Sequence, residues 1–329
     1  MLAKTSVGVA GVLALLATGC QKDSDPSTVP TEESPFASVE VAAQSSERFT
    51  NPWSGVPLPN GAVAFIATLP ATEEEPARAA VLQGAPDGEP SVIYSGPLLS
   101  SPLDLDVSVD GTLLFVADSV HVDAEGQNAG GAIVEVPLDG SEPRAVALGH
   151  APRAVTVADS GDVYFSGRDP EDGAVGVFRL SGDTVERVYA GAPLVDPSGI
   201  AVFADGRLLV ADTSLSDAED SELASRSGVV LIHDGEASVF ATGFETGYPA
   251  GIALTADDGT LIVSGQGPDS SNLVFLFSTA DPSEPVYVET AFAGEHWSSA
   301  GLHRAHGENR FAWCDRNASG GTIYAITAR

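Results

Sequence analysis

Five polar or aromatic side chains stand inside, or at the head of, apolar segments that are typical of β-strands. Asp104 and Asp106 lie in PLDLDV, His303 lies in SAGLHR, and Trp53 and Arg153 each follow a proline that opens such a segment. Carboxylate, imidazole and guanidinium groups can hold polar groups of a ligand, and an indole offers an apolar face. A buried charge is costly unless it has water or a partner. The pattern therefore predicts a small polar ligand site, or else a set of side chains that water satisfies.

Acidic loops form a second group of candidates. The longest, residues 212–227, reads DTSLSDAEDSELASRS, and its candidate metal ligands are Asp217, Glu219 and Asp220. Calcium prefers carboxylate oxygens, so it is the one cofactor that the sequence suggests. The loop lacks the spacing of an EF-hand, however, and charged loops are commonly just hydrated. Calcium binding and plain solvation therefore both stay open.

No residue pattern indicates a catalytic mechanism. His296, His303 and His306 are close together in HWSSAGLHRAH, but their spacing does not match a helical metal motif. The chain has no G-x-S-x-G motif, no paired Cys and His, and no glycine-rich phosphate loop. We therefore predict no catalytic residue and favour a protein that is not an enzyme.

The segments that carry these side chains are copies of one unit. In PSGIAVFADGRLLVADT, residues 197–213, two apolar runs flank an Asp-Gly turn, which predicts a β-hairpin. The opening proline recurs, and a serine replaces it once, at Pro52, Pro102, Pro152, Pro197, Pro249 and Ser299. Two further strand-like runs follow in most units. Four strands every 45 to 52 residues are typical of propeller blades, so the sequence predicts six blades.

The last unit contains only three strands, which suggests how the ring closes. Residues 37–43, ASVEVAA, precede the first unit and can supply the missing fourth strand. Closure of this kind leaves no open sheet edge. We therefore predict an all-β fold over residues 37–329: a six-bladed β-propeller of four-stranded antiparallel blades, the last one closed by an N-terminal strand. Asp118, Asp212 and Asp315 follow the second strands of their units and are predicted to cap turns.

The phrases PSGIAVFADGRLLVADT and PAGIALTADDGTLIVSG resemble NHL repeats, and the whole chain resembles the six-bladed gluconolactonase/SMP-30 family. In that family an Asn and an Asp just before the glycine of the inner strand, together with a Glu near the first inner strand, hold a divalent cation. The equivalent positions here carry no carboxylate or amide: Trp53, Leu103, Arg153, Ser198, Ala250 and Ala300. We therefore expect a non-catalytic binding module for a protein or a small ligand. A hydrolase of this family with an altered metal site, or an envelope scaffold, is the alternative.

The first 36 residues predict export and membrane attachment. Lys4 and an apolar run of 11 residues, too short to span a bilayer, indicate a signal peptide over residues 1–19. The segment LATGC resembles the lipobox of bacterial lipoproteins, which implies a lipid anchor on Cys20 with acyl chains such as palmitate. Residues 20–36 are polar and read as a disordered tether. Gln21 in place of Asp favours the outer membrane; an ordinary signal peptide that leaves a free Cys20 thiol is the alternative.

The charge of the chain restricts its partners. The formal net charge is −31, and lysine occurs only at Lys4 and Lys22. Phosphate backbones would be repelled, so nucleic acid is excluded. The expected partners are the membrane, through the lipid anchor, and a protein or a small molecule. Cys314 has no partner if Cys20 carries lipid, and we expect it to be a buried thiol.

Overall fold

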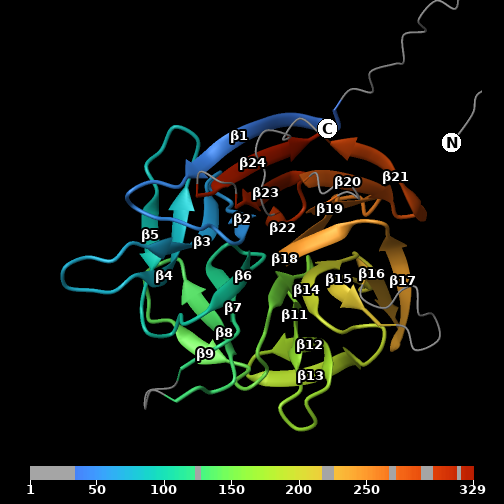
Figure 1. Ribbon diagram of the computed structural model, residues 1–329, viewed down its shortest axis with the longest axis horizontal. Coiled ribbons are helices and arrows are strands. Elements are labelled where there is room, and N and C mark those ends of the chain that lie inside the picture. Colours follow the sequence, from blue (N-terminus) through green and yellow to red (C-terminus); the bar gives the residue numbers. More distant parts are fainter. Residues whose placement is uncertain (1–33, 123–126, 217–225, 267–271, 290–298, 317–319) are drawn as a thin grey trace, which may run out of the picture. The chain divides into compact units, whose positions relative to one another are not determined.

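The computed structural model of the chain describes residues 34–122, 127–216, 226–266, 272–289, 299–316 and 320–329. Residues Pro35–Arg329 form one structural unit. In this unit the strands assemble into six antiparallel sheets of four strands each. Figure 1 shows the sheets arranged radially around a central axis, so the predicted six-bladed β-propeller is confirmed.

The blades are numbered in chain order, and each is given from its innermost strand outward. Blade 1 is β2 (Gly55–Pro57), β3 (Val63–Leu69), β4 (Arg78–Gly84) and β5 (Ser91–Tyr94); blade 2 is β6 (Pro102–Val107), β7 (Leu113–Asp118), β8 (Ala132–Pro137) and β9 (Arg144–Val146); blade 3 is β10 (Ala154–Val157), β11 (Val163–Arg168), β12 (Val175–Ser181) and β13 (Thr184–Ala190). Blade 4 is β14 (Pro197–Val202), β15 (Leu208–Leu215), β16 (Arg226–His233) and β17 (Glu236–Thr242); blade 5 is β18 (Glu245–Leu254), β19 (Thr260–Gln266), β20 (Asn272–Ser278) and β21 (Asp281–Glu289); blade 6 is β22 (Ser299–Arg304), β23 (Arg310–Asp315), β24 (Thr322–Ala328) and β1 (Phe36–Gln44).

The predicted closure of the ring is also confirmed. Strand β1 pairs antiparallel with β24 along its whole length, from Phe36 opposite Ala328 to Gln44 opposite Thr322. Just beyond this ladder the backbone N–H of Arg329 donates to the carbonyl of Pro35 at 2.9 Å. In Figure 1 the blue strand β1 therefore lies on the outside of the red strand β24. The two ends of the domain share one blade, as the missing fourth strand of the last unit required.

The core lies between neighbouring blades. Phe115 of blade 2 packs in one buried cluster with Phe165 and Phe178 of blade 3, whose rings stack with centroids 5.4 Å apart. Each sheet is thus covered on both faces, which explains why the strands near the channel are almost continuously apolar in sequence. Within the described part of the chain, no helix is long and apolar enough to cross a membrane.

The turn after the innermost strand requires one residue in the left-handed region. Gly206 takes it in blade 4, with a φ of 89°, four residues after the last paired residue Val202. In blade 5 the same place falls on Asp258, with a φ of 59°, rather than on Gly259, because Leu254 is the last residue paired. Aspartate is one of the few residues that tolerate this conformation.

Candidate functional site

The inner edges of the blades create a hydrogen-bonding problem at the channel. Each innermost strand pairs on one side only, so N–H groups on its other edge need partners. Two carboxylates of β6 supply them for β10. Asp104 Oδ2 accepts from the N–H of Val155 at 3.0 Å, and Asp106 Oδ2 accepts from the N–H of Val157 at 2.7 Å. Since both pairs are two residues apart, the carboxylates take the place of a neighbouring strand and join blade 2 to blade 3.

Asp104 also links two further blades. Its Oδ1 accepts from the hydroxyl of Ser54 in blade 1 at 2.5 Å and from Nε2 of His303 in blade 6 at 2.7 Å. Asp104 and His303 are only 2% and 6% exposed. One buried carboxylate therefore holds four of the six blades together at the axis.

His303 is positively charged at neutral pH. Burial opposes its protonation, but the adjacent carboxylates of Asp104 and Asp106 outweigh that effect and raise the pKa of His303 to about 9. Its Nδ1 lies 3.9 Å from Oδ2 of Asp106. Burial raises the pKa of Asp106, against the attraction of His303 and His306 and two backbone N–H donors. A protonated imidazole has no free lone pair, so His303 cannot act as a metal ligand or a general base in this state.

A second layer of charged groups lies where the inner strands end. His306 places Nδ1 2.9 Å from Oδ1 of Asp159 and Nε2 2.8 Å from the carbonyl of Val107. Both neighbours are acceptors, which requires both ring nitrogens to donate. Although burial disfavours the charged form, the nearby carboxylates and this carbonyl raise the pKa of His306. Arg304 adds a donor to Asp159 at 3.1 Å. The short loops of blades 3 and 6 thus meet across the axis.

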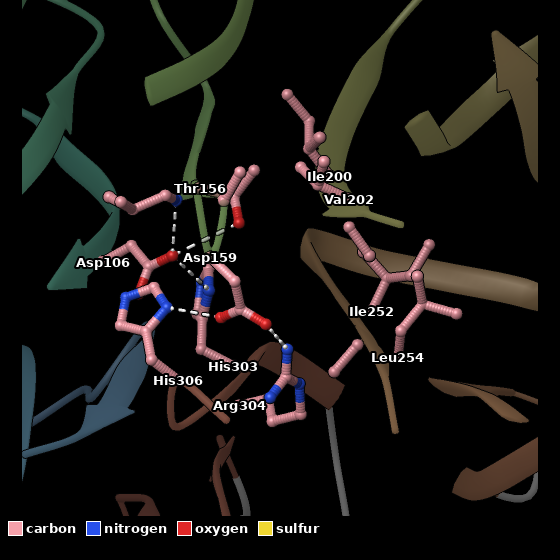
Figure 2. Close-up of a pocket in the computed structure, with 14 residues that line it drawn as sticks. Asp106, Thr156, Asp159, Ile200, Val202, Ile252, Leu254, His303, Arg304 and His306 are labelled. Carbon is pink, nitrogen blue, oxygen red and sulfur yellow. Dashed lines mark hydrogen bonds and ion pairs between the residues drawn. The ribbon is translucent and has the colours of Figure 1, made fainter. Parts of the chain in front are cut away.

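These groups form one wall of a small cavity (Figure 2). Its other wall is apolar and comes from blades 4 and 5, with the side chains of Ile200, Val202, Ile252 and Leu254. The cavity volume is about 40 Å³. A buried water needs roughly 10–15 Å³ measured in this way, so the space holds only a few waters. The charged set is balanced, with three anions and three cations: Asp104, Asp106, Asp159, His303, Arg304 and His306.

A different group of side chains lies where the inner strands begin. Arg153, just before β10, forms an ion pair with Asp196, just before β14, and its guanidinium carbon is 5.5 Å from the ring centre of Tyr248 in β18. Blades 3, 4 and 5 therefore meet above the channel through one guanidinium. The side chains of Arg153 and Asp196 are 29% and 34% exposed, so a ligand can still reach them.

Trp53 and Arg316 form the matching contact of blades 1 and 6. Trp53 lies just before β2, and Arg316 follows β23, which runs antiparallel to its inner strand. The guanidinium carbon of Arg316 is 4.0 Å from the ring centre of Trp53, and burial lowers the pKa of Arg316. We call Trp53, Arg153, Asp196, Tyr248 and Arg316 the mouth cluster. All five are partly exposed.

The five residues singled out from the sequence thus fall into two places. Asp104, Asp106 and His303 come together inside the channel, whereas Trp53 and Arg153 lie at its mouth with different partners. The sequence reasoning missed Ser54, Asp159, Asp196, Tyr248, Arg304 and Arg316, and it assigned no role to His306. Most of these are loop or strand-end residues, and only the proline that opens each unit marked their vicinity.

The predicted strand-end caps are found in two blades. Asp118 accepts from the backbone N–H groups of Ser100, Ser101 and Val120 at 2.6 to 3.1 Å. Asp212 accepts in the same way from residues 195, 196 and 214. Burial raises the pKa of both carboxyls despite these donors. The two carboxylates hold the loops around the mouth in place.

The remaining candidates have different outcomes. Cys20 and the calcium candidates Asp217, Glu219 and Asp220 lie outside the described residues. Among the residues that are described, no group of three or more His, Cys, Asp or Glu side chains is placed to hold a metal ion. Cys314 is a free thiol that is fully buried, as predicted, and burial raises its pKa.

Comparison with known proteins supports the fold alone. No protein-family model and no curated protein sequence matches the chain. A luciferin-regenerating enzyme has a TM-score of 0.57 at 11% identity, over 88% of this chain and 95% of its own. A protein of Thermus thermophilus described as a candidate oxidoreductase (glucose dehydrogenase) reaches 0.58 at 16% identity, over 88% and 99%. A gluconolactonase of Xanthomonas campestris reaches 0.47 at 17% identity, over 90% and 98%.

Proposed function

We propose that this protein is a non-catalytic binding module that holds a small ligand or a protein segment at the mouth cluster. One contrast carries the proposal. The charged groups inside the channel are engaged with one another and with backbone groups, around a cavity of about 40 Å³. The mouth cluster instead presents two aromatic rings and two guanidinium groups that are partly open to solvent. Aromatic and arginine side chains of this kind dominate binding sites.

A ligand screen by thermal shift tests this function. Binding to the native state raises the melting temperature, and the effect grows with ligand concentration over Kd. We expect at least one small molecule or peptide to stabilise the wild-type chain but not a Trp53→Ala variant. A Val92→Ala variant is the control, because Val92 is 51% exposed on the outermost strand of blade 1, away from the mouth. If every stabilising compound acts equally on Trp53→Ala, the mouth cluster is not the binding site.

An assay of lactone hydrolysis with and without calcium distinguishes binding from turnover. The hydrolase alternative predicts hydrolysis of lactones that depends on a divalent cation. Calorimetry with calcium tests whether Asp217, Glu219 and Asp220 bind the ion. Lactone turnover that responds to calcium would overturn the non-catalytic assignment.

We also propose that the module is a lipoprotein, held in the outer membrane of a bacterium through Cys20. The support is the segment LATGC followed by Gln21 and a polar stretch. Replacing Cys20 with alanine is expected to move the protein from the membrane fraction to the soluble fraction, and globomycin is expected to block maturation. A mature protein that is soluble with Cys20 intact would contradict the anchor.

A further inference from the structure

Arg316 differs from most arginines of the described residues, because it is half-buried without a carboxylate partner; Arg168, which also lacks one, is exposed and donates to the carbonyl of Gly173. In the described residues nine arginines form ion pairs with carboxylates: Arg48, Arg78, Arg144, Arg153, Arg179, Arg187, Arg207, Arg304 and Arg310. Arg316 is half-buried, and no carboxylate of the described residues pairs with it. It rests instead on the ring of Trp53.

This arrangement is costly in a chain with 46 acidic residues. Removing a guanidinium from water is unfavourable unless an anion or good acceptors replace the water. A stacking contact with an indole recovers only part of that cost. A chain so rich in carboxylates could easily supply a partner, as it does for Arg153 through Asp196. The environment of Arg316 therefore points to an anion that none of the described residues supplies.

We infer that the mouth cluster binds a small organic monocarboxylate, whose carboxylate pairs with Arg316 and whose apolar part lies against the ring of Trp53. This inference rests on the proposed function and names its ligand class. The planar fork of a guanidinium matches a carboxylate in two parallel hydrogen bonds. The one guanidinium of the mouth cluster that no described carboxylate neutralises balances a single negative charge. A phosphate group carries up to two charges, and the acidic chain, with a net charge of −31, would repel the second.

The second arginine contributes shape rather than charge. Arg153 is already neutralised by Asp196, and its guanidinium faces the ring of Tyr248. It holds Tyr248 of blade 5 against blades 3 and 4, and so fixes one rim of the mouth. The opposite rim, Trp53 with Arg316, provides the charge. This division explains why the cluster needs two arginine–aromatic pairs for only one anion.

Titration calorimetry tests the inference on the full chain. The probes are the sodium salts of acetate, benzoate and phenylacetate, with benzamide, phenylacetamide and inorganic phosphate for comparison. At least one carboxylate is expected to bind wild type in a saturable manner, and its amide is not. The Arg316→Gln variant is expected to bind it about 10- to 100-fold more weakly. Arg48→Gln serves as the matched control, because it removes the same charge from an exposed pair with Glu89, and it is expected to bind as wild type does.

Each other result has a definite meaning. Equal affinity of Arg316→Gln and wild type, tighter binding of the amide, or tighter binding of phosphate overturns the monocarboxylate. If no carboxylate binds but a neutral compound stabilises wild type and not Trp53→Ala, the ligand class is wrong while the binding function stands. If no carboxylate binds and no neutral compound stabilises wild type in a way that depends on Trp53, both the ligand class and the proposed binding function are wrong. The melting temperature of Arg316→Gln is expected to be no lower than that of wild type, which separates loss of binding from loss of folding.

Discussion

Replacing His303 with glutamine is the most direct test of the charged network in the channel. The pKa of His303 rises from 6.5 to about 9 on folding, because Asp104 and Asp106 hold its proton. A group with a raised pKa contributes stability that is complete below the unfolded value and is lost as the pH rises through the folded value. A rise of about 2.5 in this pKa corresponds to roughly 3 kcal/mol, at 1.36 kcal/mol for each tenfold change in proton affinity.

The wild-type chain is therefore expected to lose up to about 3 kcal/mol of unfolding free energy between pH 6.5 and pH 9.5 through this group. The pKa of His306 is also raised above the ordinary histidine value, so this group acts in the same direction. The buried thiol of Cys314, whose pKa is raised as well, adds to the loss at the alkaline end. The contribution of His303 is therefore measured as the difference between wild type and a variant in how steeply the unfolding free energy changes with pH.

Urea unfolding at several pH values between 6 and 9.5 measures the effect. His303→Gln keeps a donor for Asp104 but cannot carry a charge, so the part of the slope that belongs to His303 is expected to disappear. The variant is also expected to be less stable at pH 6.5, since two buried carboxylates lose their cation. The reasoning is refuted if wild type is equally stable at pH 6.5 and 9.5, or if the variant keeps the full slope. His233→Gln, on an exposed side chain, is the control.

Three further predictions concern the ring. Asp104→Asn is expected to lower stability by about 3–5 kcal/mol, because it leaves the charge of His303 without its closest partner, and chemical unfolding at pH 7 will measure the loss. Gly251→Ala is expected to cost about 1–3 kcal/mol by the same assay, because a Cβ atom there would lie 2.6 Å from the carbonyl of Ala300 in blade 6; the equivalent residue of blade 3 is already Ala154. Deleting residues 36–44 is expected to lower the melting temperature and to increase hydrogen exchange in β24, whereas unchanged melting would contradict closure by β1.

The fold was predictable because its signals are local and repeated. An apolar run, a turn that tolerates positive φ and a second apolar run identify each hairpin, and six copies at a nearly constant period specify blades. The left-handed residue of blade 5 is Asp258 because it is the fourth residue after the last paired residue, Leu254. Closure was predictable because the last unit contained three strands and an unused strand preceded the first.

The sites were only partly predictable, for two physical reasons. Asp104, Asp106 and His303 were conspicuous as polar residues inside apolar strands, but three of their partners are backbone N–H groups, which leave no trace in sequence. Other contacts join residues that are far apart along the chain, such as His306 and Asp159, 147 residues apart. Their proximity depends on how the blades face one another across the axis. The spacing of the repeats in the sequence does not specify this arrangement. Arg316 was equally inconspicuous in the sequence. Its role in the mouth cluster depends on its contact with Trp53, which only the folded chain brings close.

The contact between Pro35 and Arg329 has a mechanical consequence. Strands β1 and β24 are antiparallel, and Pro35 and Arg329 lie next to each other at the same end of this pair. A force that pulls these two residues apart therefore loads the hydrogen bonds between the strands one at a time. Strand β1 should then separate from β24 by sequential rupture of these hydrogen bonds at low force, which opens the ring. A force applied between Pro35 and a residue in the middle of blade 3 would load many bonds together, and the same domain should resist it far better.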